Sequence, residues 1–183
     1  MSKSAIATAA NSGLGFYSSP LVEPETPKIS PLISQSIKLE NIDTIGPGNT
    51  PRLVYQTSAG RCSRLVSKAD FARIWSCFLS IRGVKHSRIL EINITDHSLI
   101  IQTNQGTVAV DKNQAKMFLS RYNRVALEPL QVRLIPQGAV VWNPDHHTLS
   151  LVKSGGCTCE DWRYRQTICK HQIAAQLCQM PSN

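Results

Sequence analysis

The sequence predicts an α+β protein in which a disordered arm precedes a small mixed domain with an antiparallel meander and then a compact, cysteine-rich module. Apolar residues recur at helical spacing in two segments and alternate at strand spacing in several others. Four of the six cysteines lie in the last 27 of the 183 residues. The predicted order of helix, three strands, helix and strand, with a hairpin appended, is that of an α+β fold.

Residues 1–51 are expected to form the disordered arm. They hold six of the ten prolines and many Ser and Thr residues, and no stretch has a clear period of 2 or 3.6. Such a segment buries too little apolar surface to offset the entropy lost on ordering. The pairs Leu32-Ile33 and Ile37-Leu39 are interpreted as occasional apolar residues of the arm, with a docking peptide as the alternative.

The first helix is expected to begin after Ser67 and to stop at Gly83. Ser67 and Asp70 have the spacing of a capping box, although Asp is a weaker partner than Glu or Gln. One apolar stripe follows at the spacing of a helix face, formed by Phe71, Ile74, Trp75, Phe78 and Leu79. This stripe is interpreted as core packing.

Alternation then predicts a three-stranded meander at residues 90–94, 99–101 and 108–110. Asp111 is expected to cap a second helix, whose apolar face consists of Ala115, Phe118, Leu119 and Tyr122. A strand at 130–135 and a hairpin around Asn143-Pro144-Asp145 complete the pattern. We therefore expect three parts, namely the arm at residues 1–51, an α+β domain of unknown role at 52–135 and a separate module at 136–180.

The positive charge lies in the part expected to fold. The formal charge of the whole chain is +8, but residues 1–51 hold three basic and four acidic groups, whereas residues 52–183 hold 17 basic and eight acidic groups. A basic folded body is typical of proteins that meet polyanions. The longest apolar runs are only a few residues, against roughly 20 for a spanning helix, so we expect a soluble protein with no membrane partner.

Metal-ligand chemistry is concentrated in residues 157–171, which read C-x-C, nine residues, C-x-H. The three thiols and one imidazole form the set of four soft ligands that a closed tetrahedral zinc site needs. The candidate ligands are Cys157, Cys159, Cys169 and His171. Because residues i and i+2 of a straight strand face opposite ways, the chain must bend between the first two cysteines, and Gly155-Gly156 supplies freedom for that bend.

This cluster resembles the SWIM zinc finger, a β-β-α module with ligand order C-x-C and C-x-H, over roughly Gln137 to Gln179. The four candidate ligands fall on the metal positions of the family. Trp162 falls on its internal aromatic, and Lys170 and Ala174 fit its C-K-H-x-x-A ending. Thr167-Ile168 departs from the Gly and Pro that the family often has before the third ligand. The resemblance implies one structural zinc ion.

Several alternatives accompany this interpretation. The thiols could instead form a reduced structural cluster or a redox switch. Cys178 is interpreted as a buried small hydrophobe, and Cys62 and Cys77 stand alone. Asp145-His146-His147 is not expected to form a second metal site. His86 and His97 are expected to have no catalytic or metal-binding role.

Between the ligand pairs, basic and aromatic residues interleave in a way that suits nucleic acid, since bases stack on rings and guanidinium groups bind phosphates. The candidate contacts are Arg163, Tyr164, Arg165 and Lys170. Trp162 is expected to form the small core of the finger, which leaves Tyr164 as the stacking residue. The alternative is that the basic residues only balance the net charge of −1 of a zinc ion with three thiolates.

We therefore expect a non-enzymatic zinc protein that binds DNA rather than RNA, with a protein-interaction adaptor as the alternative. The resemblance implies either role, since the family occurs in proteins of chromatin, transposition and recombination. The eight acids of residues 52–183 are scattered and no phosphate-binding loop motif is present, so neither an enzyme nor a small-molecule substrate is expected. Free cysteines and the lack of a secretory signal core indicate a reducing intracellular compartment, cytoplasmic or nuclear. The acid-free first 22 residues leave an organellar transit peptide as an alternative, although they contain no Arg.

Overall fold

The computed structural model describes residues 23–32, 38–84 and 87–180. The first half of the described chain contains β1 (Lys38–Ile45), β2 (Thr50–Thr57), β3 (Gly60–Leu65), α1 (Lys68–Ile81), β4 (Ile89–Ile94), β5 (Ser98–Thr103) and β6 (Gly106–Asp111). The second half contains α2 (Lys112–Leu127), β7 (Gln131–Ile135), β8 (Gly138–Asn143), β9 (Thr148–Lys153), β10 (Gly156–Cys157), α3 (Glu160–Arg165) and α4 (Lys170–Gln179).

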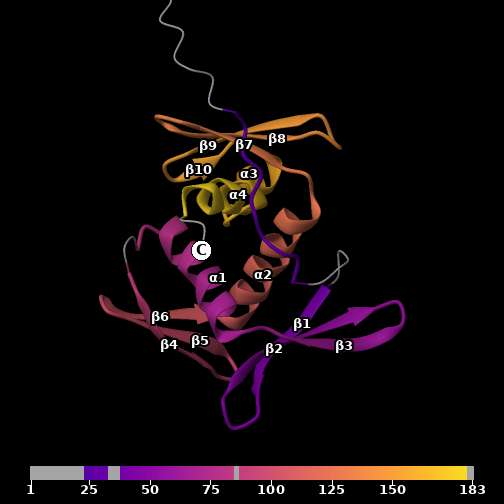
Figure 1. The fold of residues 1–183 in the computed structure, drawn as a ribbon, viewed down its shortest axis with the longest axis vertical. Coiled ribbons are helices and arrows are strands. Elements are labelled where there is room, and N and C mark those ends of the chain that lie inside the picture. Colours follow the sequence, from indigo (N-terminus) through magenta and orange to yellow (C-terminus); the bar gives the residue numbers. More distant parts are fainter. Residues whose placement is uncertain (1–22, 33–37, 85–86, 181–183) are drawn as a thin grey trace, which may run out of the picture.

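Within the described residues, the strands form three antiparallel sheets, ordered β1-β2-β3, β4-β5-β6 and β10-β9-β8-β7. Figure 1 shows the four-stranded sheet at one end of the molecule, with α3 and α4 against it. The long helices α1 and α2 fill the middle, and the two three-stranded sheets lie at the other end. The predicted α+β class and the predicted meander, which is β4-β5-β6, are confirmed.

The two residues expected to cap helices do so in the structure. The Ser67 hydroxyl oxygen accepts a hydrogen bond from the Asp70 N–H at the start of α1, and the Asp111 carboxylate accepts from Asn113 and Gln114 at the start of α2. The predicted stripes of both helices are buried and face each other. Their rings form one aromatic cluster around Trp75, made of Phe71, Trp75, Phe78, Phe118 and Tyr122.

The expected boundary between residues 135 and 136 does not coincide with a break in the structure. β7 pairs with β8 along its whole length, so the strand at 131–135 belongs to the sheet of the cysteine-rich module. In addition, α4 packs against both α1 and α2. Ile173, Ala174 and Leu177 of α4 lie in the same apolar cluster as Trp75. The described parts of 52–135 and 136–180 therefore share one core.

The prediction of a disordered arm is wrong for residues 38–51. These residues form β1 and the start of β2, which pair with each other, and β2 pairs with β3. The alternation of β1 is hidden in the sequence because the register shifts between Leu39 and Asn41. This irregularity places the buried residues Leu39 and Ile42 three positions apart instead of two.

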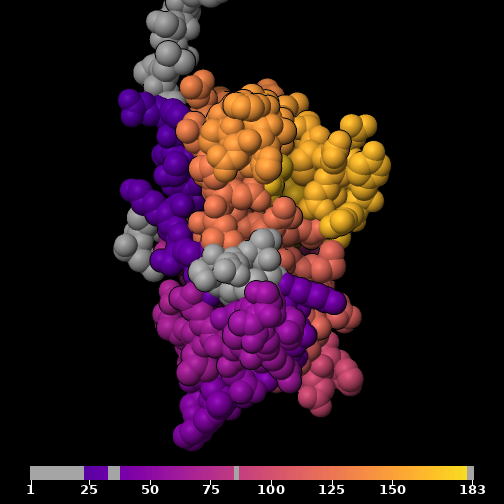
Figure 2. All heavy atoms as spheres, turned by 90° about the vertical axis from the view of Figure 1, so that its right-hand side faces the viewer, coloured from indigo at the N-terminus to yellow at the C-terminus, as the bar shows by residue number. Residues whose placement is uncertain are grey.

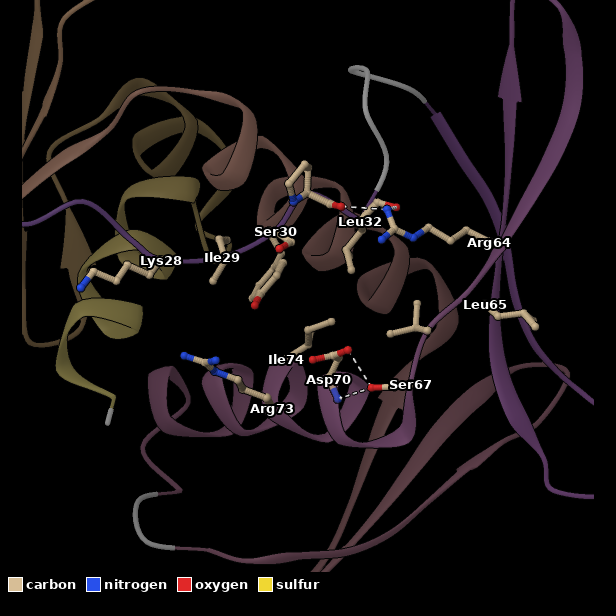
Figure 3. A pocket seen from close by; sticks show the side chains of 13 residues that line it. Lys28, Ile29, Ser30, Leu32, Arg64, Leu65, Ser67, Asp70, Arg73 and Ile74 are labelled. Atoms are coloured by element: carbon tan, nitrogen blue, oxygen red, sulfur yellow. Dashed lines mark hydrogen bonds between the residues drawn. The ribbon is translucent and has the colours of Figure 1, made fainter. Parts of the chain in front are cut away.

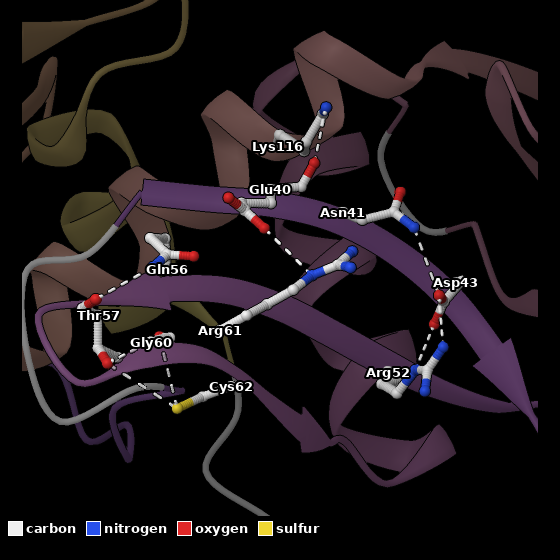
Figure 4. Close-up of polar contacts among 10 residues, drawn as sticks. All are labelled: Glu40, Asn41, Asp43, Arg52, Gln56, Thr57, Gly60, Arg61, Cys62 and Lys116. Carbon is white, nitrogen blue, oxygen red and sulfur yellow. Dashed lines mark hydrogen bonds and ion pairs between the residues drawn. The ribbon is translucent and has the colours of Figure 1, made fainter.

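Polar contacts also tie this sheet together and to α2, as Figure 4 shows. The Arg52 guanidinium donates to both carboxylate oxygens of Asp43 across the β1-β2 pair, at 2.8 Å each. This contact holds the pKa of Asp43 below its usual value, the hydrogen bond being the largest cause. The Lys116 ammonium of α2 donates to the Glu40 carbonyl of β1 at 3.0 Å.

Leu32 and Leu39, which the sequence suggested were incidental apolar residues of the arm, belong to the buried core. Residues 1–22 of the predicted arm, Ile33 and Ile37 of the apolar pairs, and His86 lie outside the described residues. Within residues 23–32, 38–84 and 87–180, no helix is both long enough and apolar enough to cross a bilayer.

Ile42→Ala tests the packing of β1. The Ile42 side chain is 0% exposed, so the truncation should lower the free energy of unfolding by about 2 to 5 kcal/mol. Urea unfolding followed by tryptophan fluorescence measures this change. The control is Ile45→Ala on the same strand, where the side chain is 45% exposed and should cost less than about 1 kcal/mol. Equal effects of the two variants would show that residues 38–45 do not pack on the core.

Candidate metal centre

The cysteine and histidine ligands converge from two bends of the chain. Cys157 ends β10, and Cys159 is the N-cap residue of α3, so the strand-to-helix transition turns the two thiols toward one point. Cys169 is the N-cap residue of α4 and His171 lies in its first turn. Both the bend after β10 and the position of the second pair at the start of a helix were predicted, and both are confirmed.

The ligand atoms of these four residues all lie within 4.8 Å of one another. Cys157 Sγ and His171 Nδ1, for example, are 3.9 Å apart. A tetrahedral zinc ion with Zn–S bonds of about 2.3 Å places its sulfurs about 3.8 Å apart. Three of the four ligand residues are buried, and Cys159 is half-buried. The donor set, its spacing and its burial therefore fit one zinc ion with four protein ligands.

Hydrogen bonds around the cluster hold the ligands in place. The Trp162 N–H donates to Cys159 Sγ at 3.4 Å, and the Cys169 N–H donates to the Gln172 side chain at 3.0 Å. Thr158, between the first two ligands, is tied to β9 through Leu151, with its N–H donating to the Leu151 carbonyl and its hydroxyl accepting from the Leu151 N–H. Such supporting contacts orient the ligands before the metal binds. Sequence reasoning missed Thr158 and Gln172, although Gln172 has capping-box spacing from Cys169.

Two glycines permit the turn into the site. Gly155 has φ +83°, a conformation that side chains with a Cβ rarely adopt. At Gly156, a Cβ would lie 3.1 Å from Trp162 Nε1. Trp162 therefore packs closely over the β10 backbone, but it is only half-buried and α3 has no buried residue, so the expectation that Trp162 forms the core of the finger is met only in part.

In the absence of a cation, the Cys159 and Cys169 thiols favour the protonated form. The hydrogen bond with the Cys157 side chain, together with burial, raises the pKa of Cys169 to about 12. Burial likewise raises the pKa of Cys159. A zinc ion must therefore displace thiol protons when it binds, because only thiolates serve as ligands.

Other cysteines and histidines lie apart from the cluster. Cys178 packs against the core, and burial raises its pKa to about 11, which agrees with the expected small hydrophobe. Cys77 is buried in α1 and Cys62 is exposed on β3. Among the described residues, no second cluster suited to a metal includes Asp145, His146, His147 or His97.

The candidate nucleic-acid residues differ in their surroundings. Arg163, Tyr164 and Arg165 lie exposed on α3, and Tyr164 is 84% exposed. Lys170 is largely buried and pairs with the Glu128 carboxylate at the end of α2. Lys170 was a candidate contact for nucleic acid. A phosphate would therefore have to compete with the Glu128 carboxylate for the Lys170 ammonium.

Zinc binding by the four ligands is tested by Cys157→Ser and His171→Ala. The intact chain should hold one zinc ion, and each variant should hold none at equimolar metal because three ligands cannot close the site. Native mass spectrometry measures the stoichiometry, with Cys62→Ser as the control that keeps its metal.

Removing the metal with a chelator should also reduce helicity and lower the stability of the whole described body, because α4 contributes to the shared core. One zinc per chain with unchanged helicity in either ligand variant would contradict the assignment.

Thr167 offers a stability test where the sequence departs from the family pattern. Its Oγ1 is buried without a hydrogen-bond partner among the described residues, so Thr167→Val should raise the free energy of unfolding by about 1 kcal/mol. Thr158→Val, which removes the exposed hydroxyl that bonds Leu151, should instead lower it by at most about 0.5 to 1.5 kcal/mol. Urea unfolding of the zinc-loaded chain measures both, and a loss of stability in Thr167→Val would contradict this view of the site.

Comparison with known proteins agrees with this geometry. Residues 140–178 match the family model of the SWIM zinc finger. No curated protein and no solved structure matches the chain. The match runs from β8 into α4 and contains all four ligands. Residues 140–178 are therefore similar to the SWIM zinc finger, and their cysteine and histidine cluster is suited to binding one zinc ion.

Proposed function

We propose that the protein binds nucleic acid, DNA rather than RNA, through the exposed face of α3. One observation carries the proposal: Tyr164 is 84% exposed and stands between two exposed arginines, Arg163 and Arg165. An exposed ring is free to stack on a ligand, and a nucleic-acid base is a suitable partner because every base has a stacking face. DNA is preferred because the resemblance implies a role in chromatin, transposition or recombination.

α3 itself carries two acids, Glu160 and Asp161, and two arginines, Arg163 and Arg165, and Arg121 of α2 adds a further cation beside it. Arg121 takes both oxygens of the Asp161 carboxylate, at 3.0 and 3.1 Å, and Arg165 approaches the same carboxylate at 3.2 Å. Two cations thus share one carboxylate. Arg163 has no ion pair within the described residues. The exposed guanidinium groups of Arg163 and Arg165 are therefore available to phosphates.

A second shared carboxylate continues this pattern beside the finger. Glu128 pairs with Lys170 and also with Arg124, whose Nε lies 3.4 Å from Glu128 Oε1. The exposed side chain of Arg124 lines a surface hollow together with Arg165 and Cys169. Lys170 is thus paired with Glu128 and is not placed as a direct contact for nucleic acid. Together with Arg124 it carries more positive charge than the single Glu128 carboxylate balances.

The basic surface extends from α3 along α2 to the start of β1. Arg121, Arg124 and Arg165 also line a neighbouring hollow, which includes Lys116 of α2 and Lys38 of β1. The Lys116 ammonium donates to a neutral carbonyl, that of Glu40, and so keeps its charge. This continuous line of cations supports a track for a phosphate backbone that is longer than the finger itself.

A protein-interaction adaptor is the second candidate, and Leu149 favours it. Leu149 is 64% exposed on β9 and lines the hollow beside Cys159 and Cys169. Together with Tyr164 it offers apolar surface that a protein partner would cover. We further propose that the finger has no catalytic role, since a zinc ion with four protein ligands has no open position for water or substrate.

Binding is tested by fluorescence anisotropy of the zinc-loaded chain with labelled single-stranded DNA, double-stranded DNA and RNA. We expect DNA to bind most tightly, and Tyr164→Ala and Arg163→Glu each to weaken binding about tenfold, since stacking contributes roughly 1 to 3 kcal/mol per base. Arg88→Glu is the matched control for Arg163→Glu, because Arg88 is exposed beside β4, in the sheet at the other end of the molecule.

The salt dependence separates the finger from the longer track. The four basic groups at the finger, Lys153, Arg163, Arg165 and Lys170, predict a log-affinity against log-salt slope on double-stranded DNA no steeper than about −3.6. A steeper slope that becomes shallower in Lys116→Gln would show that α2 contributes. No binding to any of the three nucleic acids at low salt would exclude the proposal and favour the adaptor.

A further inference from the structure

Residues 23–32, which we call the strap, run along the body from the four-stranded sheet toward the β1-β2-β3 sheet (Figures 1 and 2). At one end Glu25 pairs with Val132 of β7 through two backbone hydrogen bonds of 2.7 Å. At the other end the Arg64 guanidinium donates to the carbonyls of Pro31 and Leu32, at 2.9 and 2.6 Å. The strap is thus held at both ends, and it forms one wall of a pocket.

This pocket has a volume of about 330 Å³, within the lower part of the range of small-molecule sites, about 300 to 1,000 Å³. Its walls are the strap, the residues that link β3 to α1, and one face of α1, with Tyr122 reaching it from α2. Figure 3 shows Arg73, Ile74 and Asp70 on α1 facing the strap. The pocket is lined by none of the metal ligands and by no residue of α3.

Two polar groups of the pocket have no hydrogen-bond or ion-pair partner among the residues that the structure describes. Tyr122 is 4% exposed, and its hydroxyl makes no hydrogen bond to any described residue. Burial raises the pKa of Tyr122 to about 12, so the hydroxyl stays protonated and able to donate. The half-buried guanidinium of Arg73 likewise has no ion pair or hydrogen bond within the described residues. Both groups are therefore free to donate to an acceptor bound in the pocket.

The acid nearest in sequence makes no ion pair with Arg73 within the described residues. Asp70 lies three residues earlier on α1 and lines the same pocket, but its carboxylate accepts a hydrogen bond from the Ser67 hydroxyl at 2.7 Å. Arg64 and Lys28 also line the pocket. The residues that line the pocket thus include three cations and one carboxylate, although the Arg64 guanidinium is directed to the strap carbonyls.

We propose that this pocket binds a small anion that bears a carboxylate or phosphate group, with the Arg73 guanidinium and the Tyr122 hydroxyl as its donors. A guanidinium offers two parallel N–H donors to either group. Ile29, Leu32 and Ile74 supply apolar walls for the remainder of such a molecule. The small volume and the carboxylate of Asp70 make the pocket unsuited to a nucleic-acid strand, so the site is distinct from the surface of α3.

The test follows the zinc-loaded full chain by ¹H–¹⁵N NMR during titration with inorganic phosphate or acetate at constant ionic strength. We expect saturable shifts of the Arg73 side-chain Nε–H and of the Ile29 and Ile74 amides, with one of the two anions. Saturation by phosphate alone identifies a phosphate group as the ligand chemistry, and saturation by acetate alone identifies a carboxylate. Shifts that grow linearly with both anions, or that are confined to α3, would overturn the proposal.

Two variants assign the effect to the pocket. Arg73→Met and Tyr122→Phe should each weaken the saturable binding by about tenfold or more, because each removes a donor to a charged group. Tyr122→Phe keeps the ring, so the core remains filled and the variant should keep a native spectrum. Arg133→Met changes the net charge as Arg73→Met does, at an exposed position on β7, and should bind like the unaltered chain. Unchanged binding in both pocket variants would overturn the proposal.

Discussion

The packing of α4 between the four-stranded sheet and the two long helices is the interaction on which the rest of the structure depends. One face of this helix places Ile173, Ala174 and Leu177 in the core that surrounds Trp75. Its N-terminus carries two of the four metal ligands, Cys169 and His171. Burial of the helix therefore positions the ligands, and the metal in turn would hold the start of the helix. The finger is a part of the core and not a module attached to it.

Beside the finger, two carboxylates are each shared by two cations. Asp161 forms ion pairs with Arg121 and Arg165, and Glu128 forms ion pairs with Arg124 and Lys170. Each carboxylate thereby links α2 to the finger, which stabilises the relative position of the two, and each leaves one cation unbalanced. The same contacts that fix the position of the finger thus also keep its surface positive.

Much of the fold and most of the metal site could be predicted because their signals are local. Helix stripes, the caps at Ser67 and Asp111, and the C-x-C and C-x-H pairs all depend on residues within a few positions of each other. β1 was missed because the irregularity after Leu39 breaks the alternation and because Pro47 lies in the turn after β1 and Pro51 lies in β2. The strap was missed because its order depends on contacts with Arg64 and Val132, which are distant in sequence.

By itself, the sequence determined the class of the fold, the four ligands and the metal they suit, because a thiol or imidazole keeps its chemistry wherever the chain carries it. Only the tertiary structure decided that α4 shares its core with α1 and α2, that Lys170 faces Glu128, and that Arg73 and Tyr122 meet beneath the strap. These outcomes depend on which distant surfaces are buried together. Burial, in turn, decides whether a charged or polar group finds a partner in the protein or remains available to a ligand.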